Sequence, residues 1–203
     1  MKRRNVLKSA ARWALAGTAA GLLAACSESK PQFKAIDLTG ADYARDFQLT
    51  DHNGQPRSLK DFRGKLVVMF FGYTQCPDVC PTSMTELAEA KKLLGPGGDR
   101  LQGLFVTVDP ERDTPEVLKA YMANFDPTFL ALRGTPEQLA ALAKEYKVYF
   151  KKVEGKTPTS YTMDHSAASY VYDTEGRVRL YTRYGSGAQA LASDLKLLLA
   201  QEG

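Results

Sequence analysis

The chain has 203 residues, of which 44% are hydrophobic, and a formal net charge of +4. Five of its 27 basic residues and none of its 23 acidic residues lie within residues 1–25, so the rest carries 22 positive and 23 negative charges. This balance argues against nucleic-acid binding, which needs a basic face, and the composition argues against disorder. The length beyond residue 25 suits one domain that buries about 70% of its unfolded surface.

Residues 1–25 are predicted to be a signal peptide. A basic start is followed by an uncharged run from Trp13 to Ala25, and these thirteen residues are fewer than the ~20 that a membrane-spanning helix needs. Arg3 and Arg4 resemble the twin-arginine export signal, with the general secretion route as the alternative. We therefore expect an exported protein that faces the periplasm or another extracytoplasmic space.

The segment from Leu23 to Cys26 resembles a bacterial lipobox, in which the cysteine becomes the lipidated first residue. Lipidation of Cys26 would anchor the protein to the membrane. Ordinary cleavage with an incidental cysteine is the alternative. Residues 26–45 are predicted to be the lipidated N-terminus and a tether, although Phe33, Ile36 and Leu38 indicate that part of this segment packs.

The lipid assignment leaves Cys76 and Cys80 as one pair in an oxidising compartment. Both belong to the domain predicted over residues 46–203, in which strands and helices alternate. The first elements are a strand over Phe47–Thr50 with a turn at Asp51–Gly54, a fully buried strand over Leu66–Phe71, a helix that follows the cysteines and stops at Gly95, and a second buried strand over Leu104–Val108.

Two further helices are predicted from their opening residues. Thr114 and Thr135 each precede Pro and Glu, a pattern that caps a helix N-terminus, and Val117 and Leu118 belong to the apolar face of the first. An antiparallel hairpin over Ala167–Tyr172 and Val178–Tyr184 and a closing helix around Leu191–Leu199 follow. This order is typical of an α/β, thioredoxin-like fold, in which helices flank a central mixed β-sheet.

The cysteine pair follows the first buried strand and leads into a helix. Strand ends of open α/β sheets are where ligands bind. Spacing of i, i+4 on a helical turn would place both sulfurs on one face, which suits chelation of one soft metal ion. The same spacing can close a redox disulfide between Cys76 and Cys80 or a plain structural one, so the spacing leaves these alternatives open.

His165 and His52 are the two histidines of the chain. His165 precedes a predicted strand, in a loop that faces the cysteine helix in a thioredoxin-like fold, so we predict it as a third ligand. Two thiolates and one imidazole favour copper, whereas zinc would also need a fourth ligand that the sequence does not identify. His52 lies in a turn and is predicted to be solvated.

Three motifs together resemble the Sco/SenC family, copper proteins that assist assembly of the CuA centre of cytochrome c oxidase. The motifs are Gly72-Tyr73-Thr74 with Cys76-Pro77-Asp78-Val79-Cys80-Pro81, Val108-Asp109-Pro110-Glu111-Arg112-Asp113-Thr114-Pro115, and Asp164-His165-Ser166-Ala167 leading to Tyr170. The resemblance implies that Cys76, Cys80 and His165 bind Cu(I) or Cu(II), and that the partner is the CuA-bearing oxidase subunit.

Other residues near these motifs carry weaker predictions. Asp109 would lie at the rim of the copper site or cap the turn before the Thr114 helix, and Asp78 would be an outer carboxylate of the site or an exposed turn residue. Met163 is predicted to fill the core.

Two function classes remain open at this stage. One is a copper metallochaperone, which turns over no substrate. The other is a membrane-tethered thiol-disulfide oxidoreductase that keeps the cysteines of the oxidase copper site reduced. The wider cysteine spacing and the lack of a proline before the Ala167 strand weigh against the oxidoreductase, and little supports a third alternative, a peroxidase.

Overall fold

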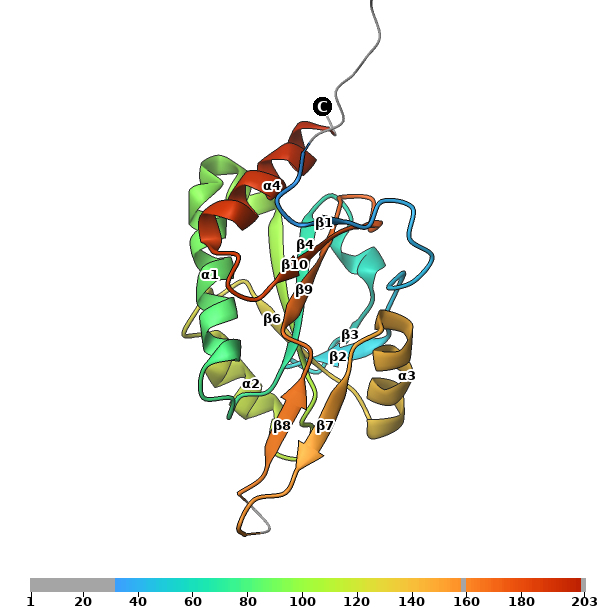
Figure 1. Ribbon diagram of the computed structural model, residues 1–203, viewed down its shortest axis with the longest axis vertical. Helices are drawn as coiled ribbons and strands as arrows, with labels where there is room; N and C mark the ends of the chain where they lie inside the picture. Colours follow the sequence, from blue (N-terminus) through green and yellow to red (C-terminus); the bar gives the residue numbers. More distant parts are fainter. Residues whose placement is uncertain (1–31, 158–159, 202–203) are drawn as a thin grey trace, which may run out of the picture. The chain divides into compact units, whose positions relative to one another are not determined.

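The computed structural model describes residues 32–157 and 160–201, and the predicted signal peptide and Cys26 lie outside these residues. Figure 1 shows a central sheet with helices on both of its faces. The strands are β1 (Ile36–Asp37), β2 (Leu49–Asp51), β3 (Pro56–Arg57), β4 (Leu66–Gly72), β5 (Leu101–Thr107), β6 (Leu130–Arg133), β7 (Phe150–Val153), β8 (Thr162–His165), β9 (Ala168–Tyr172) and β10 (Val178–Arg183). The helices are α1 (Val79–Leu93), α2 (Pro115–Met122), α3 (Pro136–Tyr146) and α4 (Ala188–Ala200), with short 3-10 helices η1 (Leu59–Phe62) and η2 (Gly95–Arg100).

Eight strands form the main sheet in the order β1-β10-β9-β4-β5-β6-β2-β3. Strands β4, β5 and β6 run parallel, whereas β9 pairs with β4 and β2 pairs with β6 in the antiparallel sense. All seven residues of β4 and of β5 are buried, as expected for strands covered on both faces. The predicted mixed sheet is therefore confirmed, and the cysteine strand β4 lies inside it.

Helices α1 and α4 pack against each other on one side of the sheet, and α3 covers the other side (Figure 1). The predicted helix starts are confirmed, because the side chains of Thr114 and Thr135 accept hydrogen bonds from backbone N–H groups of α2 and α3. One expectation for α2 is wrong. Val117 is 41% exposed, since the helix turns Leu118 and Met122 toward the core instead.

The domain begins earlier in the chain than residue 46. Strand β1 pairs with β10, Phe33 and Leu38 pack against the core, and Ala44 is fully buried. The backbone N–H groups of Lys34 and Ala35 donate to the buried Asp194 of α4 at 2.9 and 2.8 Å. Residues 33–45 of the predicted tether therefore belong to the packed domain.

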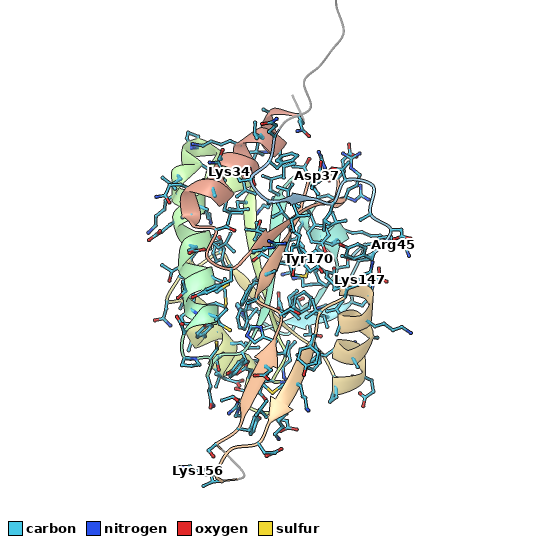
Figure 2. All side chains as sticks on the ribbon, viewed as in Figure 1. Lys34, Asp37, Arg45, Lys147, Lys156 and Tyr170 are labelled. Atoms are coloured by element: carbon cyan, nitrogen blue, oxygen red, sulfur yellow. The ribbon has the colours of Figure 1, made fainter. Side chains whose placement is uncertain are left out.

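Strands β7 and β8 form a separate two-stranded sheet that sequence analysis did not predict. Figure 1 shows this hairpin extending away from the end of the main sheet. In Figure 2, Lys156 marks the far end of the hairpin, whereas Tyr170 lies among the side chains of the core. Strands β7 and β8 pair only with each other, so side chains and loops must position the hairpin against the rest of the domain.

No helix within residues 32–157 and 160–201 has the length and apolarity needed to cross a bilayer.

Candidate metal centre

The cysteine loop begins where β4 ends, at Gly72. A methyl group on Gly72 would lie 2.8 Å from Sγ of Cys80 and 2.9 Å from ring carbons of Phe70 and Phe105. These distances are too short for carbon atoms, so glycine is needed for the Cys80 sulfur to pack against the strand. Cys80 is the second residue of α1 and is fully buried. Cys76 lies three residues before the helix and is half-buried, so the prediction that both cysteines lie on one helical turn is corrected.

The two thiols are nevertheless close to each other. Both are free, and the backbone N–H of Cys80 points at Sγ of Cys76, with 3.5 Å between nitrogen and sulfur. Burial raises the pKa of the Cys80 thiol far above its usual range, although a backbone hydrogen bond from Tyr73 counteracts part of this effect. Burial therefore favours the protonated thiol of Cys80 in the metal-free protein.

Asp113 holds the cysteine loop in place, a role that the sequence did not predict. Its side chain is fully buried and accepts hydrogen bonds from the backbone N–H and hydroxyl of Thr74 and from the hydroxyl of Thr107. Burial raises the pKa of Asp113, and the hydrogen bonds from Thr107 and Thr74 act in the opposite direction. The loop before Cys76 is thus tied to the end of the neighbouring strand β5.

His165 reaches the cysteines from β8, as its last residue rather than from a loop. Its Nε2 lies 3.3 Å from Sγ of Cys80, and its Nδ1 lies 3.1 Å from the carbonyl oxygen of Ser166. Because a carbonyl can only accept, Nδ1 carries the proton and the lone pair of Nε2 points at the sulfur. Burial lowers the pKa of His165, which favours this neutral form.

Two aromatic rings hold the imidazole. The rings of Phe70 and Tyr73 meet that of His165 edge to face, each at 5.9 Å between ring centroids. Phe70 belongs to β4, and Tyr73 directly follows its last residue, Gly72. The strand that precedes the cysteines therefore also supplies part of the imidazole pocket.

Sγ of Cys76, Sγ of Cys80 and a ring nitrogen of His165 all lie within 4.8 Å of one another. Donors bound to one ion at ~2.0–2.3 Å lie up to ~4.6 Å apart, so a small adjustment would let all three hold one metal ion. In residues 32–157 and 160–201 no fourth histidine, cysteine or carboxylate joins this group. Two sulfurs and one nitrogen without a carboxylate form a set that suits copper better than four-coordinate zinc.

The two carboxylates predicted near the site lie outside this group. Asp78 is exposed at the start of α1 and accepts a hydrogen bond from Thr82 at 3.4 Å. Asp109 is 3% exposed, and its carboxylate accepts hydrogen bonds from Nε of Arg112 and from the hydroxyl of Tyr161. Neither carboxylate contacts the N-terminus of α2, where the side chain of Thr114 itself accepts the capping hydrogen bond.

Two other sequence predictions concern residues near the site or its sheet. Met163 is 9% exposed and belongs to the core, as predicted. The prediction that His52 is solvated is wrong, because its Nδ1 accepts a hydrogen bond from the backbone N–H of Ala131 at 3.1 Å. Burial lowers the pKa of His52, so it is a neutral structural residue of the β2–β6 edge.

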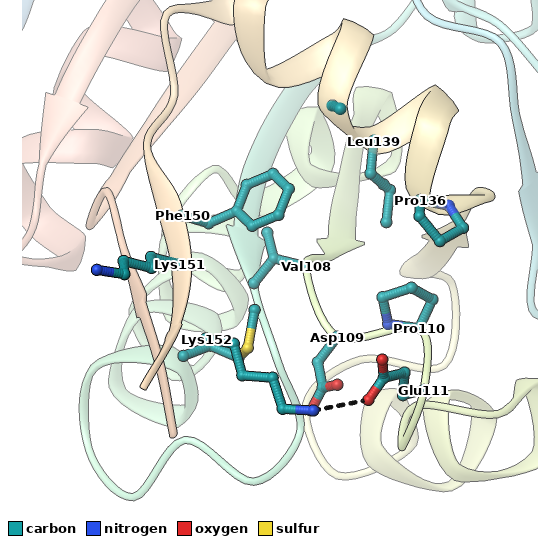
Figure 3. A pocket seen from close by; sticks show the side chains of 11 residues that line it. Val108, Asp109, Pro110, Glu111, Pro136, Leu139, Phe150, Lys151 and Lys152 are labelled. Carbon is teal, nitrogen blue, oxygen red and sulfur yellow. Dashed lines mark hydrogen bonds and ion pairs between the residues drawn. The ribbon is translucent and has the colours of Figure 1, made fainter. Parts of the chain in front are cut away.

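A separate, largely apolar hollow of about 300 Å³ lies between α3 and the hairpin (Figure 3). Val108, Pro110, Leu139, Phe150 and Met163 line it. At its edge, Nζ of Lys152 pairs with Glu111 at 3.0 Å, the interaction drawn in Figure 3. This hollow does not contain the cysteines or His165, so the chemistry of the metal-ligand group lies elsewhere.

Comparison with known proteins shows clear similarities. The SCO1/SenC family model matches residues 37–200. The mitochondrial protein SCO2 homolog of Bos taurus is 40% identical over 147 residues, which cover 71% of this chain and 54% of that protein. This chain thus spans only about half the length of that relative.

Solved structures resemble the domain closely. Bradyrhizobium japonicum ScoI with copper bound has 43% identity and a TM-score of 0.69, over 75% of this chain and 97% of that one. Apo Sco1 of Thermus thermophilus has 37% identity and a TM-score of 0.74, over 84% of this chain and 99% of that one. These likenesses confirm the predicted thioredoxin-like fold.

Proposed function

Because the chain belongs to the SCO1/SenC family, whose Sco members are cytochrome c oxidase assembly proteins, we propose that it is a metallochaperone. Its cargo is copper, which Cys76, Cys80 and His165 bind and pass to the CuA centre of an oxidase subunit. One observation carries this proposal: donors from the loop after β4, from α1 and from β8 lie within 4.8 Å of one another. Copper-bound structures of relatives support the choice of metal.

The exposure of the three donors suits transfer of a metal ion. Cys80 is fully buried, whereas Cys76 and His165 are half-buried and can be approached from solvent. A thiolate of the recipient can therefore reach the ion beside Cys76 before the buried Cys80 sulfur releases it. Soft sulfur donors hold Cu(I), and the imidazole extends the set to Cu(II).

The proposed place of action is the outer face of a membrane. Cleavage after residue 25 would leave lipidated Cys26 at the N-terminus, and residues 26–32 would connect it to the domain that begins at Phe33. Growth with radioactive palmitate tests this: the native chain should incorporate label and the Cys26→Ser chain should not. Equal labelling of both would refute the anchor.

The copper proposal is tested on the full chain with Cys26→Ser, so that Cys76 and Cys80 are the remaining thiols. We expect one Cu(I) per reduced chain, and one Cu(II) with intense sulfur-to-copper charge-transfer absorption. Copper that oxidises the pair and leaves as free ion would contradict the proposal.

A second candidate, a thiol-disulfide oxidoreductase, is favoured by the half-exposed Cys76 thiol beside Cys80. In this reaction Cys76 and Cys80 would form one disulfide, and a disulfide of the oxidase subunit would take up the two electrons and two protons. A peptide with the disulfide-bonded CuA-site cysteines is the test substrate. Stoichiometric reduction without copper supports this role, and no exchange over hours removes it.

A further inference from the structure

Two parts of the chain supply the metal-ligand group: the cysteine loop with the start of α1, and the hairpin that ends in His165. The loop after β5 contacts both of them. The hairpin pairs with no strand of the main sheet. Across its base, the N–H of Ser166 donates to the carbonyl of Tyr149 at 2.9 Å and the N–H of Tyr149 donates to the side-chain hydroxyl of Ser166 at 3.0 Å, so these bonds join the two arms of the hairpin to each other. Other contacts must set the distance from His165 to the cysteines.

Arg112, from the loop after β5, contacts both of the other segments. Its Nη1 donates to the side-chain oxygen of Gln75 at 3.0 Å, next to Cys76, and to the backbone carbonyl of Tyr161 at 2.9 Å, just before β8. Its guanidinium carbon lies 3.6 Å from the centroid of the Tyr161 ring and 5.7 Å from that of Tyr73. Tyr73 is also one of the two rings against His165.

Buried contacts fix the guanidinium itself. Nε of Arg112 donates to Asp109, whose side chain is 3% exposed, and the Arg112 side chain is 15% exposed. The hydroxyl of Tyr161 donates to the other oxygen of the same carboxylate at 2.7 Å. Asp109 therefore holds both Arg112 and Tyr161, whose ring covers the guanidinium of Arg112. A planar group with several fixed donors can bridge three segments in this way, whereas an ammonium group cannot.

We propose that Arg112, held by Asp109 and Tyr161, is a positioning residue that sets the imidazole of His165 against the two cysteine sulfurs. This inference rests on the proposed copper site but concerns the arrangement of the metal-free protein as well. It predicts that loss of the bridge displaces His165 while the cysteines remain in place, because Asp113 and β4 position the cysteines independently.

The first test is NMR of the reduced, metal-free full chain with Cys26→Ser. The ring protons of His165 sense the ring currents of Phe70 and Tyr73, and those of His52 serve as an internal reference. Arg112→Lys keeps the charge but not the fork of donors. We expect it to shift the His165 signals and leave the His52 signals unchanged. Unchanged His165 signals in Arg112→Lys would overturn the proposal.

A matched control separates positioning from general damage. Arg57→Lys alters an equally direct Nε-to-carboxylate pair, with the buried Asp51, on the edge strand β3. It should not shift the His165 signals. If Arg57→Lys shifts them as much as Arg112→Lys does, the effect is general loosening and the proposal fails.

The second test uses copper. Loss of a residue that orients a ligand typically costs 10- to 100-fold in metal affinity, so Arg112→Lys should weaken Cu(II) binding by about that factor. Cu(I) binding, which depends on the sulfurs, should change by less than about threefold. Equal weakening of both ions would contradict a role through His165. Tyr161→Phe is the milder variant if Arg112→Lys fails to fold, because it keeps the ring over Arg112 and loses the hydrogen bond to Asp109. We expect it to shift the His165 signals in the same direction, but by less.

The two tests separate this inference from the proposed function. If the native chain binds no copper, the metallochaperone proposal fails, while the NMR comparison still decides the role of Arg112. If copper binds normally and His165 is unmoved in Arg112→Lys and Tyr161→Phe, the positioning role fails and the proposed function stands.

Discussion

The candidate metal centre joins two regions that are built in different ways. The cysteines follow β4, a central strand whose seven residues are all buried and which pairs with β5 on one side and with β9 on the other. His165 lies at the end of β8, in a two-stranded hairpin outside the main sheet. Backbone pairing and core packing thus fix the sulfurs, whereas side-chain contacts from Arg112 and the rings of Phe70 and Tyr73 place the imidazole.

This difference suits a site that must hold an ion and release it. Local opening is easiest where few buried contacts and hydrogen bonds oppose it, and the hairpin has fewer of both than β4. We therefore expect changes on the cysteine side to abolish binding or destabilise the fold, and changes on the histidine side to affect one oxidation state of copper more than the other.

The largest effect is expected from Cys80→Ser. The serine side chain is close in size to cysteine, so the fold should persist, but one of two sulfur donors is lost. Binding of Cu(I) and Cu(II) should fall by more than the 10- to 100-fold typical of losing a supporting residue, which competition with a chromogenic chelator can measure. Stoichiometric, native-like Cu(I) binding in this variant would refute the assignment of Cys80.

His165→Ala should separate the two regions most clearly. Removal of the imidazole should lower Cu(II) affinity by about 100-fold or more, whereas the two sulfurs retain most of the Cu(I) affinity. The matched control is His52→Ala, which removes the other histidine from the β2–β6 edge and should leave copper binding unchanged. Equal loss of Cu(I) and Cu(II) binding in His165→Ala would contradict the role assigned to His165.

Gly72→Ala tests the packing of the cysteine side. The added methyl group would lie 2.8 Å from Sγ of Cys80 and 2.9 Å from the Phe70 and Phe105 rings, in a core without room to adjust. Such overpacking should lower the free energy of unfolding by about 1–3 kcal/mol, as measured in urea. The methyl group of Gly97→Ala would lie 3.2 Å from the end of the Leu199 side chain and 3.8 Å from Cβ of Leu94, so this variant should cost less. Equal stability of Gly72→Ala and the native chain would contradict the described packing.

Acid should affect the stability of the fold and not the metal-ligand group, through Asp51 at the end of β2. Burial acts to raise the pKa of Asp51, but hydrogen bonds from Gln55, Arg57 and Asn53 outweigh it, so the pKa lies below the ordinary 3.8. A carboxylate whose pKa is lower in the folded than in the unfolded state stabilises the fold at pH values above its unfolded-state pKa. This contribution is lost as the pH falls through the folded-state pKa.

Asp51→Asn should therefore cost about 1–3 kcal/mol at pH 7, and the difference from the native chain should shrink below about pH 3.8. Urea unfolding at several pH values measures both quantities. A difference that stays constant over this range would show that the carboxylate charge of Asp51 does not contribute. The His165 NMR signals at pH 7 should be unaffected by this substitution.

Several elements could be predicted because their signals are local. Residues 66–71 are continuously apolar, and Thr135 and Gln138 form the capping box that starts α3. The hairpin β7–β8 was missed because Lys151 and Lys152 interrupt any apolar alternation, and the hydrophobic contacts of Phe150 and Met163 lie far away in the chain. The turn predicted at Asp51–Gly54 is present, but the solvation predicted for His52 was wrong for the same reason, since its partner Ala131 is 79 residues away.

The sequence by itself determined the types of donor at the site, two thiols and an imidazole, and the family motifs that contain them. It also led to the prediction of a leader over residues 1–25 and of one cysteine pair, because composition and spacing are properties of the chain alone. Only the tertiary structure decided that Cys76 lies before the helix, and that the carboxylate of Asp109 pairs with Arg112. Contacts over tens of residues, such as that from Arg112 to Tyr161, depend on how the elements pack, and no local pattern encodes them.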